Sequence, residues 1–301
     1  MMQRTSYSVG FWDSAGRALT FIQESIGMAF RQKELLVPSL CSFLVNALVI
    51  GVFILIAHYT GNMKVLFADR AERLTEPENV KIIRYITFAG LTFLCYIITY
   101  FFMGMTVNLV SARLHGQRAN LGVAFADALN NATALVLLAV VSTLVSLITG
   151  AMRSRNRRGL GDLAAGMIER SWTVATYLLV PVIILEDVPF KKSLERGMKL
   201  HGGNFVPIAV GEVAVSTVNS IIIMAVVLLS AIAAGWAYYS GQQALMMGLI
   251  AVGALLFILT IAFTEFVRTA YYTCLYLWAV EREQVGETAR VPAPLAAALA
   301  R

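Results

Sequence analysis

The sequence has little charge, and long stretches have none. Only 14% of its 301 residues are charged, whereas 58% are hydrophobic. Soluble domains carry about 25% charged and about 45–50% apolar residues. No charged residue occurs at the 52 consecutive positions from Val213 to Thr264. A transmembrane helix needs roughly 20 apolar residues, so this run is long enough for two spans and a turn. The composition therefore excludes an ordinary soluble domain.

The sequence also lacks the motifs of metal sites and of common hydrolases. Its three cysteines, Cys41, Cys95 and Cys274, lie in apolar runs without a Cys-x-x-Cys or Cys/His spacing, which excludes a disulfide framework. Neither His58 nor His115 has a second ligand at metal-binding spacing, and there is no Gly-x-Ser-x-Gly elbow. We therefore expect no catalytic, cofactor-binding or metal-binding residues, and the sequence favours a non-enzymatic protein.

A basic face of the kind that binds nucleic acid is missing too. The net charge is +6, but the Lys and Arg residues lie between apolar runs, as they do at membrane edges beside anionic headgroups. The expected partners are therefore membrane lipids, anionic headgroups among them. A second copy of the chain or a membrane partner protein are further candidates. No cleavable signal peptide is apparent, so the first span is expected to direct insertion.

The apolar runs predict an all-α fold, a polytopic transmembrane helical bundle of about six spans with interfacial amphipathic helices. The fourth run, Trp172 to Leu185, has only 14 residues, which make about 21 Å of helix. It needs residues 163–168 to cross the bilayer, so a re-entrant segment remains an alternative there. The expected spans are 36–58, 82–110, 132–152, 172–185, 205–235 and 244–280.

Three further segments predict amphipathic helices that lie in the bilayer interface or pack on the spans. Two of them are residues 11–31 and 119–131. The third is a basic helix that begins near Phe190 and carries Leu194 and Met198 on the same side. The predicted organisation is a cytoplasmic N-terminal segment 1–34, a bundle 35–281 and a flexible tail 282–301.

Five polar side chains within the spans form a candidate site: Glu212, Glu265, Arg268, Asn108 and Asn219. Both glutamates are equally distant from position 238.5, so an antiparallel hairpin is expected to hold them at one depth, with Arg268 facing Glu212. Such a cluster could bind a proton or a cation. The alternative is an ion pair at headgroup level, with the two asparagines in interhelical hydrogen bonds.

Two patches of the sequence resemble a known family. One runs from Ser171-Trp172 through Val180-Pro181 into Phe190–Gly197, and the other joins Trp12 to Lys33–Pro38. They resemble an uncharacterised family of six-span bacterial inner-membrane proteins and, more distantly, the membrane domain associated with glycerophosphodiester phosphodiesterases. The resemblance implies a helical bundle in a bacterial inner membrane and implies no activity.

Two functional classes follow from these observations. The first is a non-enzymatic membrane component, which would be a transporter-like or lipid-handling bundle or an assembly scaffold. It is favoured by the intramembrane polar residues and by the amphipathic helices, which can touch headgroups. The second is a membrane-bound enzyme, favoured only by Glu212 and Glu265.

The charge pattern predicts that both termini are cytoplasmic. The turn from Trp236 to Gln243 has no charge, so the positive-inside rule places it outside, and six spans then put 13 Lys and Arg residues inside against 10 outside. A re-entrant fourth segment would instead give 17 against 6, with the N-terminus exported. Reporter fusions at Arg157 and Gly241 should both report the outer side, and a cytoplasmic signal at Arg157 would contradict the six-span topology.

Overall fold

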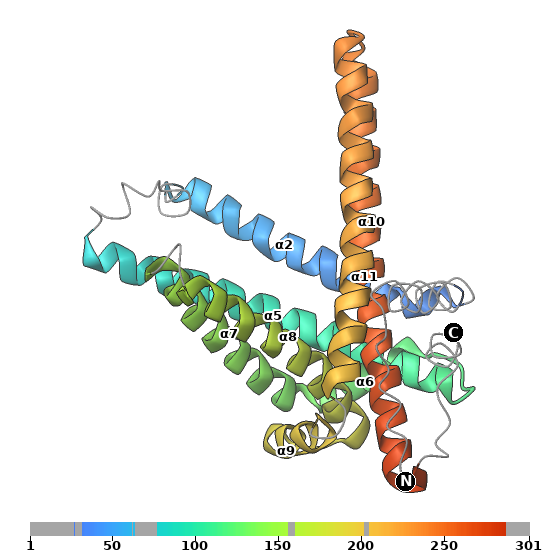
Figure 1. The fold of residues 1–301 in the computed structure, drawn as a ribbon. Helices are drawn as coiled ribbons and strands as arrows, with labels where there is room; N and C mark the ends of the chain where they lie inside the picture. The colour runs from blue at the N-terminus through green and yellow to red at the C-terminus, as the bar shows by residue number, and fades with distance from the viewer. Residues whose placement is uncertain are drawn as a thin grey trace. The chain divides into compact units, whose positions relative to one another are not determined.

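A computed structural model describes residues 32–61, 77–155, 160–201 and 205–286, together with Gly27 and Met63. Within these ranges the side chains of residues 154, 155, 160, 200, 201 and 205–215 lie outside the description. The described residues form helices and connecting turns without a strand (Figure 1). The all-α prediction is therefore confirmed.

The helices follow five of the six predicted spans closely, and the fourth helix is much longer than the predicted 172–185. They are η1 (Lys33–Leu35), α2 (Val37–Tyr59), α5 (Glu78–Leu114), α6 (Leu121–Asn130), α7 (Ala132–Arg155), α8 (Leu160–Glu186), α9 (Phe190–His201), α10 (Phe205–Tyr239) and α11 (Gln243–Val285). Among the described residues, six helices are long and apolar enough to cross a membrane: α2, α5, α7, α8, α10 and α11. This confirms the prediction of about six spans. Apart from Gly27, the predicted amphipathic segment 11–31 lies outside the described residues.

Large apolar side chains face outward along these helices. On α10, Leu229 and Ile232 are each 67% exposed, and on α11 Met247 is 69% exposed. A soluble monomer rarely exposes contiguous apolar patches of this kind, whereas hydrocarbon chains solvate them well. The exposed apolar surface is what a multi-pass membrane protein presents to lipid.

Contacts divide the chain into two compact units. One comprises Met1–Leu40, Thr106–Leu121 and Glu195–Arg301, and the other Cys41–Met105 and Gly122–Leu194. We call them the hairpin unit, which contains α10 and α11, and the α8 unit. Each is described below by itself.

The second half of α8 is the core of the α8 unit. Every residue from Thr176 to Ile184 is buried, although α8 is the least apolar of the six candidate spans. The helix runs without interruption from the charged residues Glu169 and Arg170 through Pro181. Residues 163–168 therefore belong to the same helix as 172–185, and their combined length suffices to cross a bilayer.

One buried hydroxyl, that of Ser142 on α7, connects three helices of this unit. Trp172 Nε1 of α8 donates to Ser142 Oγ at 2.9 Å, and Tyr100 Oη of α5 lies 2.7 Å from the same oxygen. Ser142 gives its own proton to the Leu138 carbonyl at 2.8 Å. Because a serine hydroxyl has one proton and two lone pairs, Tyr100 must be the donor in its bond, and every site on Ser142 Oγ is used.

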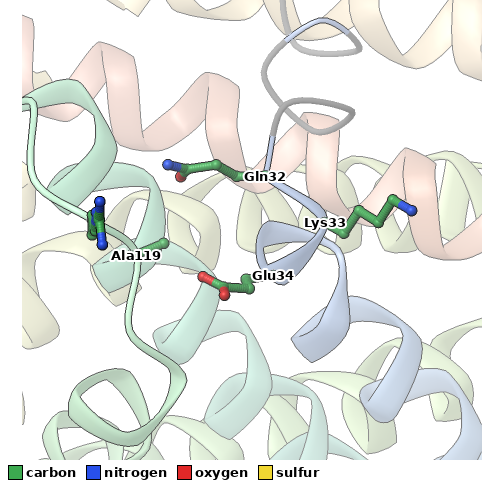
Figure 2. Close-up of a pocket in the computed structure, with 5 residues that line it drawn as sticks. Gln32, Lys33, Glu34 and Ala119 are labelled. Carbon is green, nitrogen blue, oxygen red and sulfur yellow. The ribbon is translucent and has the colours of Figure 1, made fainter.

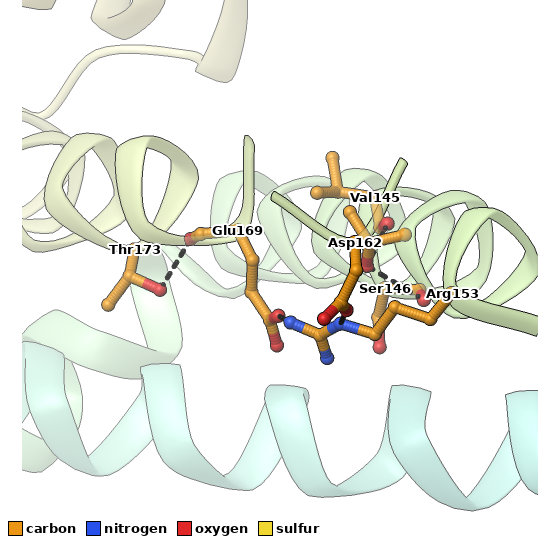
Figure 3. A network of polar contacts seen from close by, with 7 residues as sticks. Val145, Ser146, Arg153, Asp162, Glu169 and Thr173 are labelled. Atoms are coloured by element: carbon orange, nitrogen blue, oxygen red, sulfur yellow. Dashed lines mark hydrogen bonds and ion pairs between the residues drawn. The ribbon is translucent and has the colours of Figure 1, made fainter. Parts of the chain in front are cut away.

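Arg153, near the end of α7, contacts two acidic residues of α8 (Figure 3). Its Nε lies 3.6 Å from Asp162 Oδ1, and its guanidinium forms an ion pair with Glu169. All three side chains are about half exposed, so each pair is worth roughly 0–1 kcal/mol. Glu169 interrupts the apolar sequence of α8, and the ion pair with Arg153 balances its negative charge.

The helices of the hairpin unit, α10 and α11, run side by side (Figure 1). Their turn is a Schellman motif: Gly241 has a φ of 72°, its N–H bonds to the Tyr238 carbonyl, and the Gln242 N–H bonds to the Ala237 carbonyl, each at 3.1 Å. Further from the turn the helices approach closely at Gly253. A Cβ added there would lie 2.7 Å from Ser230 Cβ.

Replacing Gly253 by Val is therefore expected to separate the two helices. Overpacking of this kind costs about 1–3 kcal/mol, so the unfolding midpoint of the protein in detergent should fall. Gly248→Val is the matched control, because no heavy atom lies within 4 Å of a Cβ added at Gly248. Equal midpoints for the two variants would contradict a close contact at Gly253.

Candidate functional site

The register of the α10–α11 hairpin decides which polar residues are neighbours. Ser216 lies beside Arg268, whose Nη2 approaches its Oγ at 3.4 Å, and Ser230 lies beside Gly253. Both contacts are centred on positions 241–242, where the turn lies between Tyr239 and Gln243. Continuing this register places Asn219 level with Glu265.

The same register bears on the predicted pairing of Glu212 with Arg268. It places the Glu212 backbone level with Tyr272, about two helical turns beyond Glu265. The equal depth expected for the two glutamates assumed a hairpin centred three residues too early. The Glu212 side chain lies outside the described part of the structure, so its contact with Arg268 stays a prediction. The described neighbour of Arg268 on α10 is Ser216.

Asn219 is the most unusual polar residue of the hairpin unit. It is 2% exposed, and neither its amide oxygen nor its amide nitrogen has a hydrogen-bond partner among the described residues. The hydroxyl of Thr269 on α11, a residue 1% exposed, is likewise without a described hydrogen bond. A buried polar group without a partner costs about 1–3 kcal/mol, so these groups are candidates for contact with a polar ligand.

The remaining candidates lie nearby in sequence or on another helix of the same unit. Glu265 and Arg268 are both partly buried on α11. Asn108 is partly buried on α5, between the fully buried Val107 and Leu109. Four of the five predicted residues are therefore described side chains of the hairpin unit, and the structure places Asn219 and Glu265 at one level.

A second polar surface, which the intramembrane pattern did not indicate, lies on α9. The small residues Ser193 and Gly197 are buried on one side of this helix. The adjacent stripe is apolar and uncovered, since Leu194 is 36% and Met198 61% exposed. Farther around the helix are the exposed Lys191, Lys192, Glu195 and Lys199. The helix thus rests on protein with its small side chains and offers apolar and basic side chains to its surroundings.

An ion pair in the hairpin unit joins α9 to α11. Arg196 forms an ion pair with Glu283 through Nη2 and Oε2. On α11 the guanidinium of Arg282 lies 5.4 Å from the ring centroid of Trp278, within the range of a cation–π contact. Sequence reasoning missed the Arg196–Glu283 pair, because no local pattern links residues 87 positions apart.

A cavity lined by both polar and apolar residues lies in the α8 unit at the base of α9. Its volume is about 230 Å³, and its lining includes Asn130 and Asn131 before α7 and Asp187 and Phe190 around the turn after α8. Asp187 has a left-handed backbone with a φ of 50°, a conformation that Asp tolerates better than most residues. This turn ends α8 and directs the chain into α9.

A family model of unknown function, DUF6159, matches residues 85–286 of the chain. The match covers well over half of the 301 residues. The chain belongs to DUF6159. The DUF6159 region begins within α5 and includes every later helix of the structure, so the Ser142 contacts, α9 and the α10–α11 hairpin all lie inside it. The family carries no assigned activity. No curated protein and no solved structure matches the chain.

Substitution of Asn219 by Leu should raise the free energy of unfolding by about 1–3 kcal/mol, because it removes a buried amide without a described partner. Asn46→Leu should lower it: Asn46 Oδ1 also lacks a described partner, but Asn46 Nδ2 donates to the Ser42 carbonyl at 2.9 Å and to Thr99 Oγ1 at 3.2 Å, and the second bond joins α2 to α5. Unfolding in detergent measures both changes. A loss of stability in both variants would show that Asn219 is hydrogen-bonded in the membrane protein.

Proposed function

We propose that this integral membrane protein is a non-enzymatic, lipid-handling component that works at one face of the bilayer. The observation that carries the proposal is the surface of α9, where an uncovered apolar stripe adjoins exposed lysines. A helix with this arrangement lies in the interface, with its apolar side among acyl chains and its basic side at anionic headgroups.

The order of the helices along the chain supports a function at one side of the bilayer. If each of the six long helices crosses the bilayer once, the segments before α2, between α5 and α7, between α8 and α10 and after α11 share one side. That side then carries α6, α9 and the cavity at the base of α9. On α6, Phe125 and Leu129 are 49% and 56% exposed while Ala124 and Ala128 are buried, which suits a second interfacial helix.

The positive-inside rule assigns this face to the cytoplasm. The resemblance stated above supports a bacterial inner membrane, where anionic lipids would be the ligands of α9. An assembly scaffold would also need anchoring at the interface, but it would not need to discriminate among headgroups. Selective lipid binding therefore separates lipid handling from a scaffold role.

The triple variant Lys191→Gln, Lys192→Gln, Lys199→Gln should retain less anionic lipid. Each lysine near an anionic surface contributes about 1 kcal/mol. Protein purified from nanodiscs of mixed phosphatidylglycerol and phosphatidylcholine would be analysed by native mass spectrometry. The wild type should carry an excess of phosphatidylglycerol, and the variant should lose most of it.

The matched control lies on the same helix. Glu195 is exposed among the lysines, so Glu195→Gln should increase the phosphatidylglycerol bound. If the triple variant, Glu195→Gln and the wild type retain the same lipids, lipid selection by α9 is wrong and a scaffold role gains support.

Passage of a small polar solute or cation through the hairpin unit is a second candidate, favoured by the buried Asn219 amide and its level with Glu265. The Asn219→Leu variant distinguishes the two functions. For a polar pathway, flux into liposomes should fall while stability rises. For lipid handling alone, the variant should leave lipid retention unchanged.

A further inference from the structure

A polar cavity of about 340 Å³ lies in the hairpin unit beside the start of α2, and no residue of α9 lines it. Its lining is Gln32, Lys33, Glu34, Arg118 and Ala119. Figure 2 shows Gln32 and Glu34 reaching from the start of α2 toward the loop that holds Ala119, while Lys33 extends the opposite way. The cavity is therefore bordered by an acidic group from one segment and by a loop carrying Arg118 from another.

The positions of Glu34 and Arg118 relative to the ends of α2 and α5 indicate how deep in the membrane this cavity lies. Glu34 lies three residues before α2 begins at Val37, and Arg118 lies four residues after α5 ends at Leu114. Successive antiparallel spans return the chain to the side from which it started, so both residues stand where an apolar helix meets water. Phospholipid headgroups occupy that level of a bilayer.

The charges that border the cavity do not neutralise each other. Glu34 and Arg118 are exposed, and among the described residues neither side chain forms an ion pair. In addition, Gln32 Oε1 is buried and accepts no hydrogen bond from a described residue. Because the Lys33 side chain extends away from Gln32, Glu34 and Ala119 (Figure 2), the groups left to meet a ligand are a carboxylate, a guanidinium and one amide oxygen without a described donor.

The charges and hydrogen-bonding groups of Glu34, Arg118 and Gln32 favour one chemical class of ligand. A free anion would suit Arg118 but meet the Glu34 carboxylate, and a simple cation would meet the reverse conflict. A zwitterion with a phosphate and a primary ammonium satisfies both: guanidinium groups bind phosphate through paired N–H donors, and an ammonium has three N–H donors for Glu34 and Gln32. A choline group has no N–H and leaves Gln32 Oε1 without a donor.

We propose that this cavity binds an ethanolamine phosphate group, with the phosphate at Arg118 and the ammonium at Glu34 and Gln32. The volume suits a headgroup, since it lies near the lower end of the 300–1,000 Å³ typical of ligand sites. The proposal rests on the lipid-handling function above and names a second headgroup for it. It differs in chemistry from α9, which binds anionic lipid through lysines alone.

The test uses the full chain in detergent and short-chain dihexanoyl lipids, with affinity measured by isothermal titration calorimetry. Phosphatidylethanolamine should bind at least tenfold more tightly than phosphatidylcholine or phosphatidylglycerol. Arg118→Gln and Glu34→Gln should each weaken it at least tenfold. Arg113→Gln is the control, because Arg113 lies in the last turn of α5 and outside the lining, and it should change the affinity less than twofold.

Glycerophosphoethanolamine distinguishes the source of the ligand. If it binds as tightly as the lipid, the site takes the soluble compound, whereas tighter binding of the lipid assigns the site to the bilayer. If Arg118→Gln fails to fold, Arg118→Lys keeps the charge without the paired donors, and it should bind with intermediate affinity. Equal affinity for all three lipids, or unchanged affinity in folded Glu34→Gln and Arg118→Lys, would overturn the proposal.

The two lipid proposals can fail separately. The α9 lysine variants should leave ethanolamine binding unchanged, and the cavity variants should leave phosphatidylglycerol retention unchanged. Loss of ethanolamine selectivity with intact phosphatidylglycerol retention would overturn only the cavity. Loss of both in the α9 variant would show one continuous anionic-lipid surface and would also overturn an independent cavity site.

Discussion

Hydrogen bonding without water is the constraint on which this structure depends. Hydrocarbon offers no donors or acceptors, so backbone groups must pair within helices and polar side chains must pair between them. Ser142 illustrates the second requirement, because its hydroxyl accepts from Trp172 and Tyr100 and donates to Leu138. Such contacts fix how α5, α7 and α8 pack, since apolar surfaces alone have little preference for one another over lipid. The Asn219 amide has no hydrogen-bond partner among the described residues, which makes it a candidate for contact with a polar ligand within the hairpin unit.

Burial explains why α8 is the weakest apolar run in the sequence and yet the core of its unit. Hydropathy measures how well a helix tolerates lipid, whereas Thr176 to Ile184 are surrounded by protein. A helix in that position can carry Thr176 and Pro181 because neighbouring helices cover it. The charged half of α8 is tolerated for another reason, since Arg153 pairs with Glu169. Sequence periodicity predicts neither the burial of Thr176 to Ile184 nor the pairing of Glu169, because both depend on which helix lies next to α8.

The charged groups of both proposed lipid sites lie where helices begin and end. The lysines of α9 and the charged residues around Glu34 and Arg118 lie beside spans rather than inside them. At that level a charge can stay hydrated while apolar neighbours such as Met198 enter the bilayer. The two proposed headgroup sites would therefore bind lipid without burying an ion.

The sequence by itself determined the helices, because the number and length of apolar runs follow from the thickness of a bilayer. The observed α10 (Phe205–Tyr239) and α11 (Gln243–Val285) include the predicted 205–235 and 244–280, and the amphipathic pattern of α9 was readable from Leu194 and Met198. Only the tertiary structure decided the register. A shift of three residues in the hairpin centre places Ser216 beside Arg268 and leaves Asn219 level with Glu265. Helix pairing depends on close contacts such as Gly253 with Ser230, and these arise from packing between segments that no local sequence pattern records.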